Sequence, residues 1–335
     1  MPTSFDKSTS FDMSTSFDLS RVCTTIITTS PAPSHPSIDL IEQVLRSIAF
    51  HAPGLAACRT IIVCDGFKLV EGKCNFRGAR VDDAAAQKYA AYKIALRALL
   101  ESPPLKHCEV IELSRQHGFG FAVRAALTSV DTPLVCVIQH DRVLLRACDD
   151  SIQEVAARML QQPASGEASV GDPPHEVGYA LLPTRTALPK EYAHKCRIRL
   201  GERGIRPPAS DIEPHAIALP SGKRSLLPLL AFFDSTHLCL TRHYLEVILP
   251  SCTKGAFIES EVGPLQLAEV ESGGIAHMLS RWKCYLLDDG ESGVPLVGHL
   301  NGAVNRLAKG EMPCACRNGE KWACSACARV HAVKS

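Results

Sequence analysis

The chain has 335 residues, of which 46% are hydrophobic and 21% charged, and its formal net charge is +1. This composition supports a sizeable folded core and excludes a wholly disordered chain or a strongly basic nucleic-acid-binding protein. No apolar run approaches the roughly 20 residues that a membrane helix needs, and the N-terminus lacks the basic start and apolar core of a secretory signal. We therefore expect a soluble, cytoplasmic protein with no transmembrane segment and no nucleic-acid partner.

The first 20 residues contain an imperfect six-residue repeat, Thr-Ser-Phe-Asp followed by Lys, Met or Leu and then Ser, over residues 3–20. A short polar tract of this kind cannot bury enough apolar surface to offset the entropy that it loses on ordering. We predict a disordered tail over residues 1–20.

From residue 21 onward, the pattern alternates between strands and helices. Apolar, β-branched runs predict strands over 22–29, 60–64, 108–113 and 131–141. Helical stripes follow the first two strands, with Ser37 and Asp82 as N-caps, and Gly118 opens a third helix. Further on, the pattern predicts helices over 148–161, 184–205 and 261–269, a short helix from Thr241, a strand over 176–182, a loop plus strand over 226–240, and a last strand over 282–287. The alternation favours an α/β fold with a mostly parallel sheet flanked by helices, in one domain over residues 21–302.

Polar side chains stand where several of these strands and loops end. Asp65 and Asp141 follow apolar runs, Glu259 precedes an expected helix that begins at Glu261, and His299 lies near the end of the domain. In open parallel sheets, ligands bind beyond the carboxyl ends of the strands. A sugar nucleotide needs a carboxylate near its nucleoside and a second group near its diphosphate, usually through a divalent cation. Sugar transfer also needs a base that deprotonates the acceptor hydroxyl.

The segments that carry these residues have a recognisable form. They read Thr-Thr-Ser-Pro-Ala-Pro-Ser-His-Pro-Ser after the first strand, Ile-Ile-Val-Cys-Asp-Gly, Gln-His-Gly-Phe-Gly-Phe-Ala, Val-Ile-Gln-His-Asp, Phe-Ile-Glu and Gly-His-Leu-Asn-Gly. With these motifs, residues 22–141, and more loosely the chain to residue 302, resemble GT-A-fold glycosyltransferases of the family-2-like kind, in the nucleotide-diphospho-sugar transferase superfamily.

The resemblance implies a role for each matched residue. Asp65 would lie beside the nucleoside, Asp141 would bind the metal and diphosphate, Glu259 would be the base, and His299 would reach the same metal. The remaining candidates are Ser30, Gly118 and His140 for the donor and Asp234 for the acceptor. The expected donor is a nucleotide sugar, most simply a UDP-sugar, and the expected cofactor is Mn²⁺ or Mg²⁺.

The chain departs from the family pattern at two positions. Gln139 replaces the first acid of the Asp-x-Asp element, and Ser260 replaces the acid after the base, which leaves Glu261 as a second catalytic candidate. One carboxylate and one imidazole suit Mn²⁺ better than Mg²⁺. The main alternative is a catalytically degenerate transferase-like module that binds a nucleotide or a protein. Nucleotidyl transfer ranks third, because it needs a glycine-rich phosphate loop after the first strand.

Four of the fifteen cysteines crowd the C-terminal segment 303–335: Cys314, Cys316, Cys324 and Cys327. Two close pairs of thiols around a turn can present four sulfurs to a structural Zn²⁺, and the alternative is a flexible reducing tail. If Zn²⁺ binds, we expect a small appendage that interacts with a protein partner. The other eleven cysteines are expected to be small buried hydrophobes in a reducing compartment.

Overall fold

The computed structural model describes residues 17–103, 105–161, 176–291 and 293–300. The folded chain starts inside the range predicted as a tail: Leu19–Arg21 form a 3-10 turn capped by Asp18, and Leu19 is buried. The four C-terminal cysteines, and with them the predicted zinc site, lie outside the described residues.

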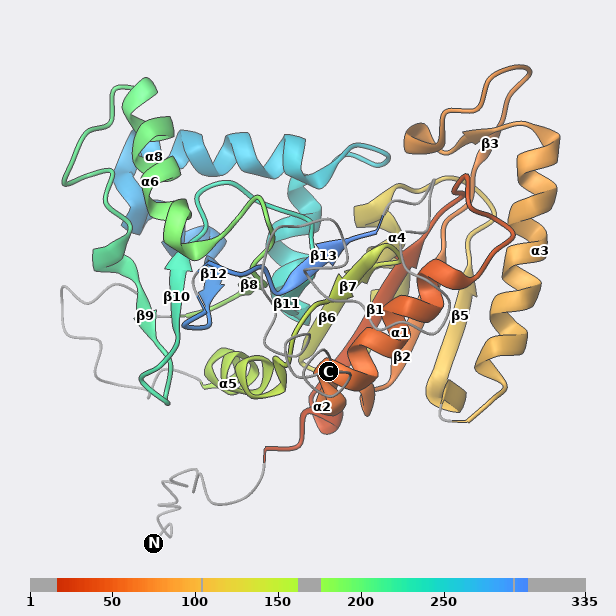
Figure 1. The fold of residues 1–335 in the computed structure, drawn as a ribbon. Helices are drawn as coiled ribbons and strands as arrows, with labels where there is room; N and C mark the ends of the chain where they lie inside the picture. The colour runs from red at the N-terminus through yellow and green to blue at the C-terminus, as the bar shows by residue number, and fades with distance from the viewer. Residues whose placement is uncertain (1–16, 104, 162–175, 292, 301–335) are drawn as a thin grey trace, which may run out of the picture.

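A nine-stranded sheet forms the centre of the molecule (Figure 1). In spatial order its strands are β5 (Cys108–Glu112), β2 (Thr60–Cys64), β1 (Cys23–Thr29), β6 (Leu134–Gln139), β11 (His237–Leu240), β8 (Tyr179–Leu181), β12 (Cys284–Asp288), β10 (Ser225–Pro228) and β9 (Ile217–Ala218). Only β11 and β10 run against the common direction among these nine strands. The predicted mostly parallel α/β sheet is therefore confirmed.

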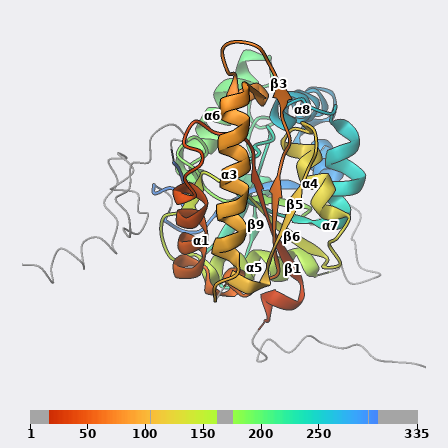
Figure 2. The ribbon, with the colours of Figure 1, turned by 90° about the vertical axis from the view of Figure 1, so that its right-hand side faces the viewer.

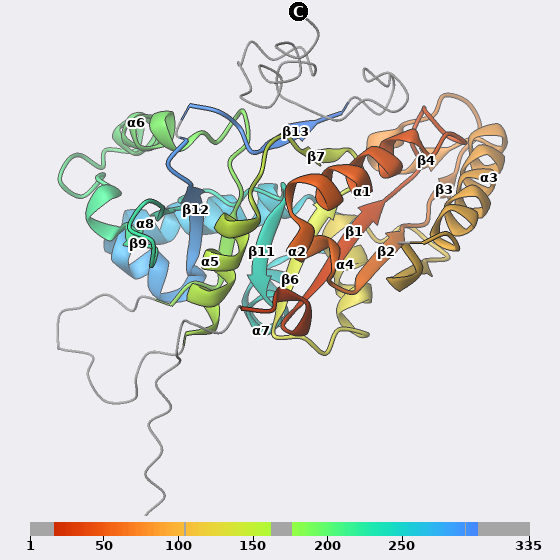
Figure 3. The ribbon, with the colours of Figure 1, turned by 60° about the horizontal axis from the view of Figure 1, so that its bottom comes forward.

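Helices cover both faces of this sheet, with α1 and α5 on one side and α4 and α8 on the other (Figures 2 and 3). The helices are α1 (Asp39–His51), α2 (Pro53–Ala56), α3 (Asp83–Leu100), α4 (Phe119–Leu127), α5 (Asp149–Leu160), α6 (Pro189–Glu202), α7 (Thr241–His243) and α8 (Ile258–Trp282). Shorter helical turns span Phe76–Gly78, Leu105–His107, Glu213–His215, Tyr244–Ile248 and Leu249–Ser251. Asp82 caps α3 as predicted, whereas Ser37 lies one residue before the cap of α1 and accepts from Asp39 N.

The central strands are apolar because helices cover them on both faces. Every residue of β1 and β2 is buried, and β6 is buried up to its last residue, Gln139. At the sheet edge, the residues of β5 are half-buried or exposed. Its Glu109 pairs with Arg59, and its Glu112 pairs with Lys93. The most apolar strands thus form the centre of the sheet, and the polar residues follow at their carboxyl ends.

Two small sheets lie beyond this frame. In one, β7 (Arg142–Leu144) pairs antiparallel with β13 (Val297–His299), so that Arg142 lies opposite His299. In the other, β3 (Lys68–Leu69) pairs with β4 (Arg80–Val81). The prediction that residues 282–287 form the last strand was wrong, because β13 follows. The helix expected over 261–269 extends over the whole of α8, although Gly274 interrupts its helical geometry.

The eleven described cysteines are all free thiols, and eight of them are buried as predicted, whereas Cys74, Cys108 and Cys252 are only partly buried. Within the described part of the chain, no helix has both the length and the apolar content required to cross a lipid bilayer.

Candidate active site

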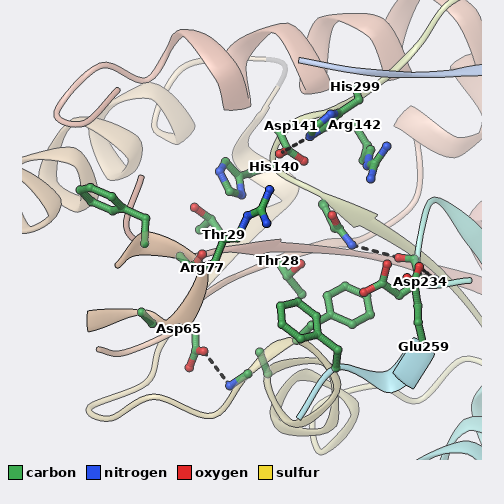
Figure 4. Close-up of a pocket in the computed structure, with 18 of the residues that line it drawn as sticks. Thr28, Thr29, Asp65, Arg77, His140, Asp141, Arg142, Asp234, Glu259 and His299 are labelled. Carbon is green, nitrogen blue, oxygen red and sulfur yellow. Dashed lines mark hydrogen bonds and ion pairs between the residues drawn. The ribbon is translucent and has the colours of Figure 1, made fainter. Parts of the chain in front are cut away.

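A cavity of about 1130 Å³ opens at the carboxyl ends of β1, β2 and β6. The last residues of β1 and the residues that follow β2 and β6 form one wall, and the segment before β11 and the start of α8 form another (Figure 4). Eight of the predicted site residues line it: Ser30, Asp65, Gly118, His140, Asp141, Asp234, Glu259 and His299. The parallel strands explain this convergence, because they bring their carboxyl ends to one edge of the sheet.

Asp65 holds the loop that precedes α4. Its Oδ1 accepts hydrogen bonds from Gly66 N at 2.9 Å and His117 N at 2.8 Å, and its Oδ2 accepts one from Gly118 N at 2.8 Å. Burial raises the pKa of Asp65, and the three backbone N–H groups oppose that rise. A carboxylate oxygen can accept two hydrogen bonds, so Oδ2 retains a lone pair for a ligand.

The glycines of the Gly-Phe-Gly sequence allow α4 to pack closely against the loop before α8. Gly118 has a φ of +78°, and a Cβ there would lie 3.1 Å from Gly255 Cα. A Cβ at Gly120 would lie 2.6 Å from Ile258 Cδ1. Gly118 lines the cavity, but its N–H is already bound to Asp65. These glycines therefore serve close packing, and the Gly118 N–H is not available to a phosphate.

Asp141 and His299 meet at the mouth of β6 because β7 and β13 are paired. His299 Nε2 lies 3.0 Å from Asp141 Oδ2. Asp141 Oδ1 is buried and has no hydrogen-bond partner among the described residues. Burial acts to raise the pKa of Asp141, but the contact with His299 and the nearby His140 and Arg142 outweigh it, and the pKa is lowered. The carboxyl group is thus held in its charged form.

This pair fits one edge of a divalent metal site. Two adjacent ligands of a small octahedral cation, each at about 2.1 Å, lie about 3 Å apart, which is the separation of these two atoms. The described residues contain no cluster of three or more His, Cys, Asp or Glu side chains arranged to hold a metal. Oxygen atoms of a ligand or water would have to complete the coordination.

Asp234 and Glu259 face each other on the opposite side of the cavity (Figure 4). β11 runs antiparallel to β6 with His237 opposite Val137, so the residues before β11 lie beside the end of β6. There Gln139 Nε2 donates to the Asp234 carbonyl oxygen at 3.1 Å, and Asp234 N donates to Glu259 Oε1 at 2.9 Å. Burial raises the pKa of Asp234 to about 8, with a further contribution from Glu259.

Glu261 does not line the cavity, and its carboxylate accepts a hydrogen bond from Thr253 N. Successive residues of a helix are rotated by about 100°, so Glu261 lies roughly 200° around α8 from Glu259. The structure therefore removes Glu261 as a catalytic candidate and leaves Glu259.

Sequence reasoning missed three arginines that line the cavity: Arg77, Arg142 and Arg185. Arg142 Nε is buried without a hydrogen-bond partner among the described residues. Arg142 directly follows Asp141, and Arg77 belongs to the basic loop between β3 and β4, so both positions carried a local signal. Arg185 had no such signal, because the turn that carries it reaches the cavity only through the pairing of Thr184 with Val297.

No protein-family model matches the chain, and no curated protein matches it in sequence. Among solved structures, it is similar to a mannosyltransferase from Pyrobaculum calidifontis in complex with GDP-Man and Mn²⁺ (18% identity over 52% of this chain and 38% of that chain, TM-score 0.32). It is also similar to glucosyl-3-phosphoglycerate synthase from Mycobacterium tuberculosis in complex with Mg²⁺ and UDP (12% identity, 84% and 72%, TM-score 0.39). A third likeness is to S. aureus TarS in complex with UDP-GlcNAc (11% identity, 90% and 62%, TM-score 0.40). The strand order, together with a cavity at the carboxyl ends of β1, β2 and β6, gives this chain the GT-A-like α/β fold that its motifs predicted.

Proposed function

We propose that this protein transfers a sugar from a nucleotide-sugar donor to the hydroxyl group of an acceptor. The observation that carries the proposal is the convergence of Asp65, Asp141, Glu259 and His299 on one cavity. Each of these residue types has a separate task in sugar transfer, and chain segments far apart in the sequence bring them together.

The nucleoside would bind at the Asp65 end of the cavity. The remaining lone pair of Asp65 Oδ2 accepts one N–H group, and uracil offers a single ring N–H. Thr28, Thr29 and Phe76 line the same cavity and add hydroxyl and aromatic surface. These features support a UDP-sugar as the donor.

The diphosphate would bind between Asp141 and the cations beside it. Asp141 and His299 would hold Mn²⁺ or Mg²⁺, which when bound stabilises negative charge on the departing diphosphate. Figure 4 shows Arg77 and His140 near Asp141, where their positive or hydrogen-bonding groups can meet phosphate oxygens. Because Gln139 supplies no negative charge to a metal, the positive side chains would take a larger share in neutralising the diphosphate.

The acceptor would bind at the Glu259 end. Glu259 removes the proton of the acceptor hydroxyl as the acceptor oxygen forms a bond to the anomeric carbon of the sugar. The bond between that carbon and the diphosphate oxygen breaks at the same time, and the nucleoside diphosphate leaves with its electron pair. The proton remains on Glu259 until solvent removes it.

A nucleotide-binding module without turnover is the second candidate. Gln139 favours it, because it brings no negative charge to a metal and its Nε2 is bound to the Asp234 carbonyl oxygen. The two functions share the donor end of the cavity and differ only in the chemistry at Glu259.

Calorimetry with UDP and Mn²⁺, followed by a panel of UDP-sugars, tests the proposal. We expect the wild-type protein to bind UDP in the presence of Mn²⁺ and to hydrolyse one UDP-sugar slowly, and we expect Asp141→Ala to lose binding. His277→Ala is a matched control, since His277 is exposed on α8. Binding with no turnover of any donor would establish the module, and no nucleotide binding would remove both candidates.

A further inference from the structure

Asp234 and Glu259 lie side by side on the wall of the cavity (Figure 4). A carboxylate has only acceptor oxygens, and two like charges close together in a buried wall repel each other, so a neighbouring pair of carboxyl groups is favoured when one of them carries a proton. The main-chain N–H of Asp234 holds Glu259 Oε1 at 2.9 Å and fixes the second carboxyl group in place. The geometry therefore places two carboxyl groups together in a position where one shared proton is favoured.

The surroundings favour a single negative charge on this unit. Burial, and then Glu259, raise the pKa of Asp234 to about 8, while Arg142 and Gln139 oppose that rise. The other titratable groups that interact with Asp234 are the buried phenols of Tyr179 on β8 and Tyr244 in the turn after α7, whose pKa values are raised well above their ordinary value. Arg142, from β7, is thus the charged group that faces the pair from another element.

Gln139 supports this unit from the end of β6. Its Nε2 donates to the Asp234 carbonyl oxygen at 3.1 Å. An aspartate or glutamate at position 139 could not donate this bond, and it would place a second negative charge beside the carboxyl pair. The residue that departs from the Asp-x-Asp pattern therefore has a task on the acid–base side of the cavity.

We propose that Asp234 and Glu259 act as one acid–base unit that holds a single proton, and that Gln139 positions this unit. The reaction that it serves rests on the transferase function proposed above. In that reaction Glu259 receives the proton of the acceptor hydroxyl. Asp234 keeps the shared proton and thereby orients Glu259, so Asp234 and Gln139 are positioning residues.

The shared proton can be detected without any enzymatic activity. A carboxyl group whose pKa is about 8 in the folded state keeps its proton at a pH where the unfolded chain, with an ordinary Asp, has lost it. Its contribution to stability is full below about pH 4 and is lost as pH rises through about 8. We expect urea unfolding of Asp234→Asn to lack this loss. The difference in slope between the two proteins should correspond to about one proton between pH 5 and pH 8.

Asp82→Asn is the matched control, since asparagine caps a helix as well as aspartate does. Its stability should follow the wild-type pH dependence. Parallel curves for the wild type and Asp234→Asn would overturn the proton-holding unit. A lost slope in Asp234→Asn together with no turnover of any nucleotide sugar would support the unit and overturn the transferase function.

Position 139 gives the test of the positioning role. Gln139→Asp restores the family pattern, and Gln139→Glu preserves the length of the side chain while removing its donor. We expect both variants to shift the proton release of the pair to higher pH and to lower kcat at pH 7 by about tenfold or more, which is less than the roughly 10²–10⁴-fold contribution of a general base because Glu259 itself remains. A rise in Mn²⁺-dependent turnover in Gln139→Asp, with an unchanged pH dependence of kcat, would overturn the positioning role of Gln139.

Discussion

His299 Nε2 lies 3.0 Å from Asp141 Oδ2, although 158 positions separate the two residues in the chain. If they hold one cation, His299→Ala removes one of its two protein ligands. We expect the affinity for Mn²⁺ in the presence of UDP to fall by about tenfold or more, as measured by calorimetry. An unchanged Mn²⁺ affinity would show that the pair is a simple ion pair. His277→Ala again controls for the loss of an imidazole.

Asp65 is expected to respond sharply to an isosteric change. In Asp65→Asn an amide N–H₂ replaces one carboxylate oxygen and faces a backbone N–H, so at least one hydrogen bond to the loop before α4 is lost. The free energy of unfolding should fall by about 1–3 kcal/mol, measured by urea titration, and UDP should bind more weakly. If Asp65→Asn bound UDP as tightly as the wild type, the nucleoside would not contact Asp65.

Gly66 tests how closely the same loop approaches β2. A Cβ at Gly66 would lie 2.4 Å from the main-chain carbon of Arg115, and backbone cannot rotate away as a side chain can. We expect Gly66→Ala to reduce the free energy of unfolding by about 1–3 kcal/mol. Gly201→Ala, in α6, is the control, because its Cβ would meet nothing within 4 Å. It should stabilise the protein by about 0.4–1 kcal/mol in the same urea titration.

Acid should destabilise the fold through its buried imidazoles. Burial lowers the pKa of His237 to about 4. Its imidazole therefore stays neutral in the folded protein at pH values below about 6.5, where the same imidazole is protonated in the unfolded chain. Stability is therefore full above pH 6.5 and is lost as pH falls towards 4, by up to about 1.4 kcal/mol per pH unit for each such group. His237→Asn should reduce this slope, whatever its effect at pH 7, whereas His277→Asn should not.

The part of the cavity that carries Asp65 and Asp141 could be predicted because its signals are local. An apolar run that ends on Asp65 or Asp141 marks both a strand and its rim, and parallel strands bring their ends together without further information. The same rule predicted the edge of the sheet at which the cavity lies.

Asp234 and Glu259 were site candidates, but their contacts with each other and with Gln139 could not be predicted in this way. Asp234 reaches Glu259 and Gln139 because β11 inserts antiparallel between β6 and β8, and sequence periodicity does not reveal which strands become neighbours. For the same reason the three-residue strand β13 was missed, although His299 was expected at the site. Glu261 was misjudged because its helix begins at Ile258, three residues earlier than predicted, which turns its side chain away.

The two walls of the cavity come from different stretches of the polypeptide. The ends of β1, β2 and β6 belong to the first 141 residues, whereas Arg185, Asp234 and Glu259 come from later segments. Under the proposed function, substitutions in the later stretch that spare Asp234, Glu259 and His299 would alter which molecule receives the sugar while the proposed nucleotide end keeps its shape. An engineer seeking a new product from the proposed transferase would randomise Arg185 and its neighbours in that later wall, keep Asp234 and Glu259, and leave the opening βα units untouched.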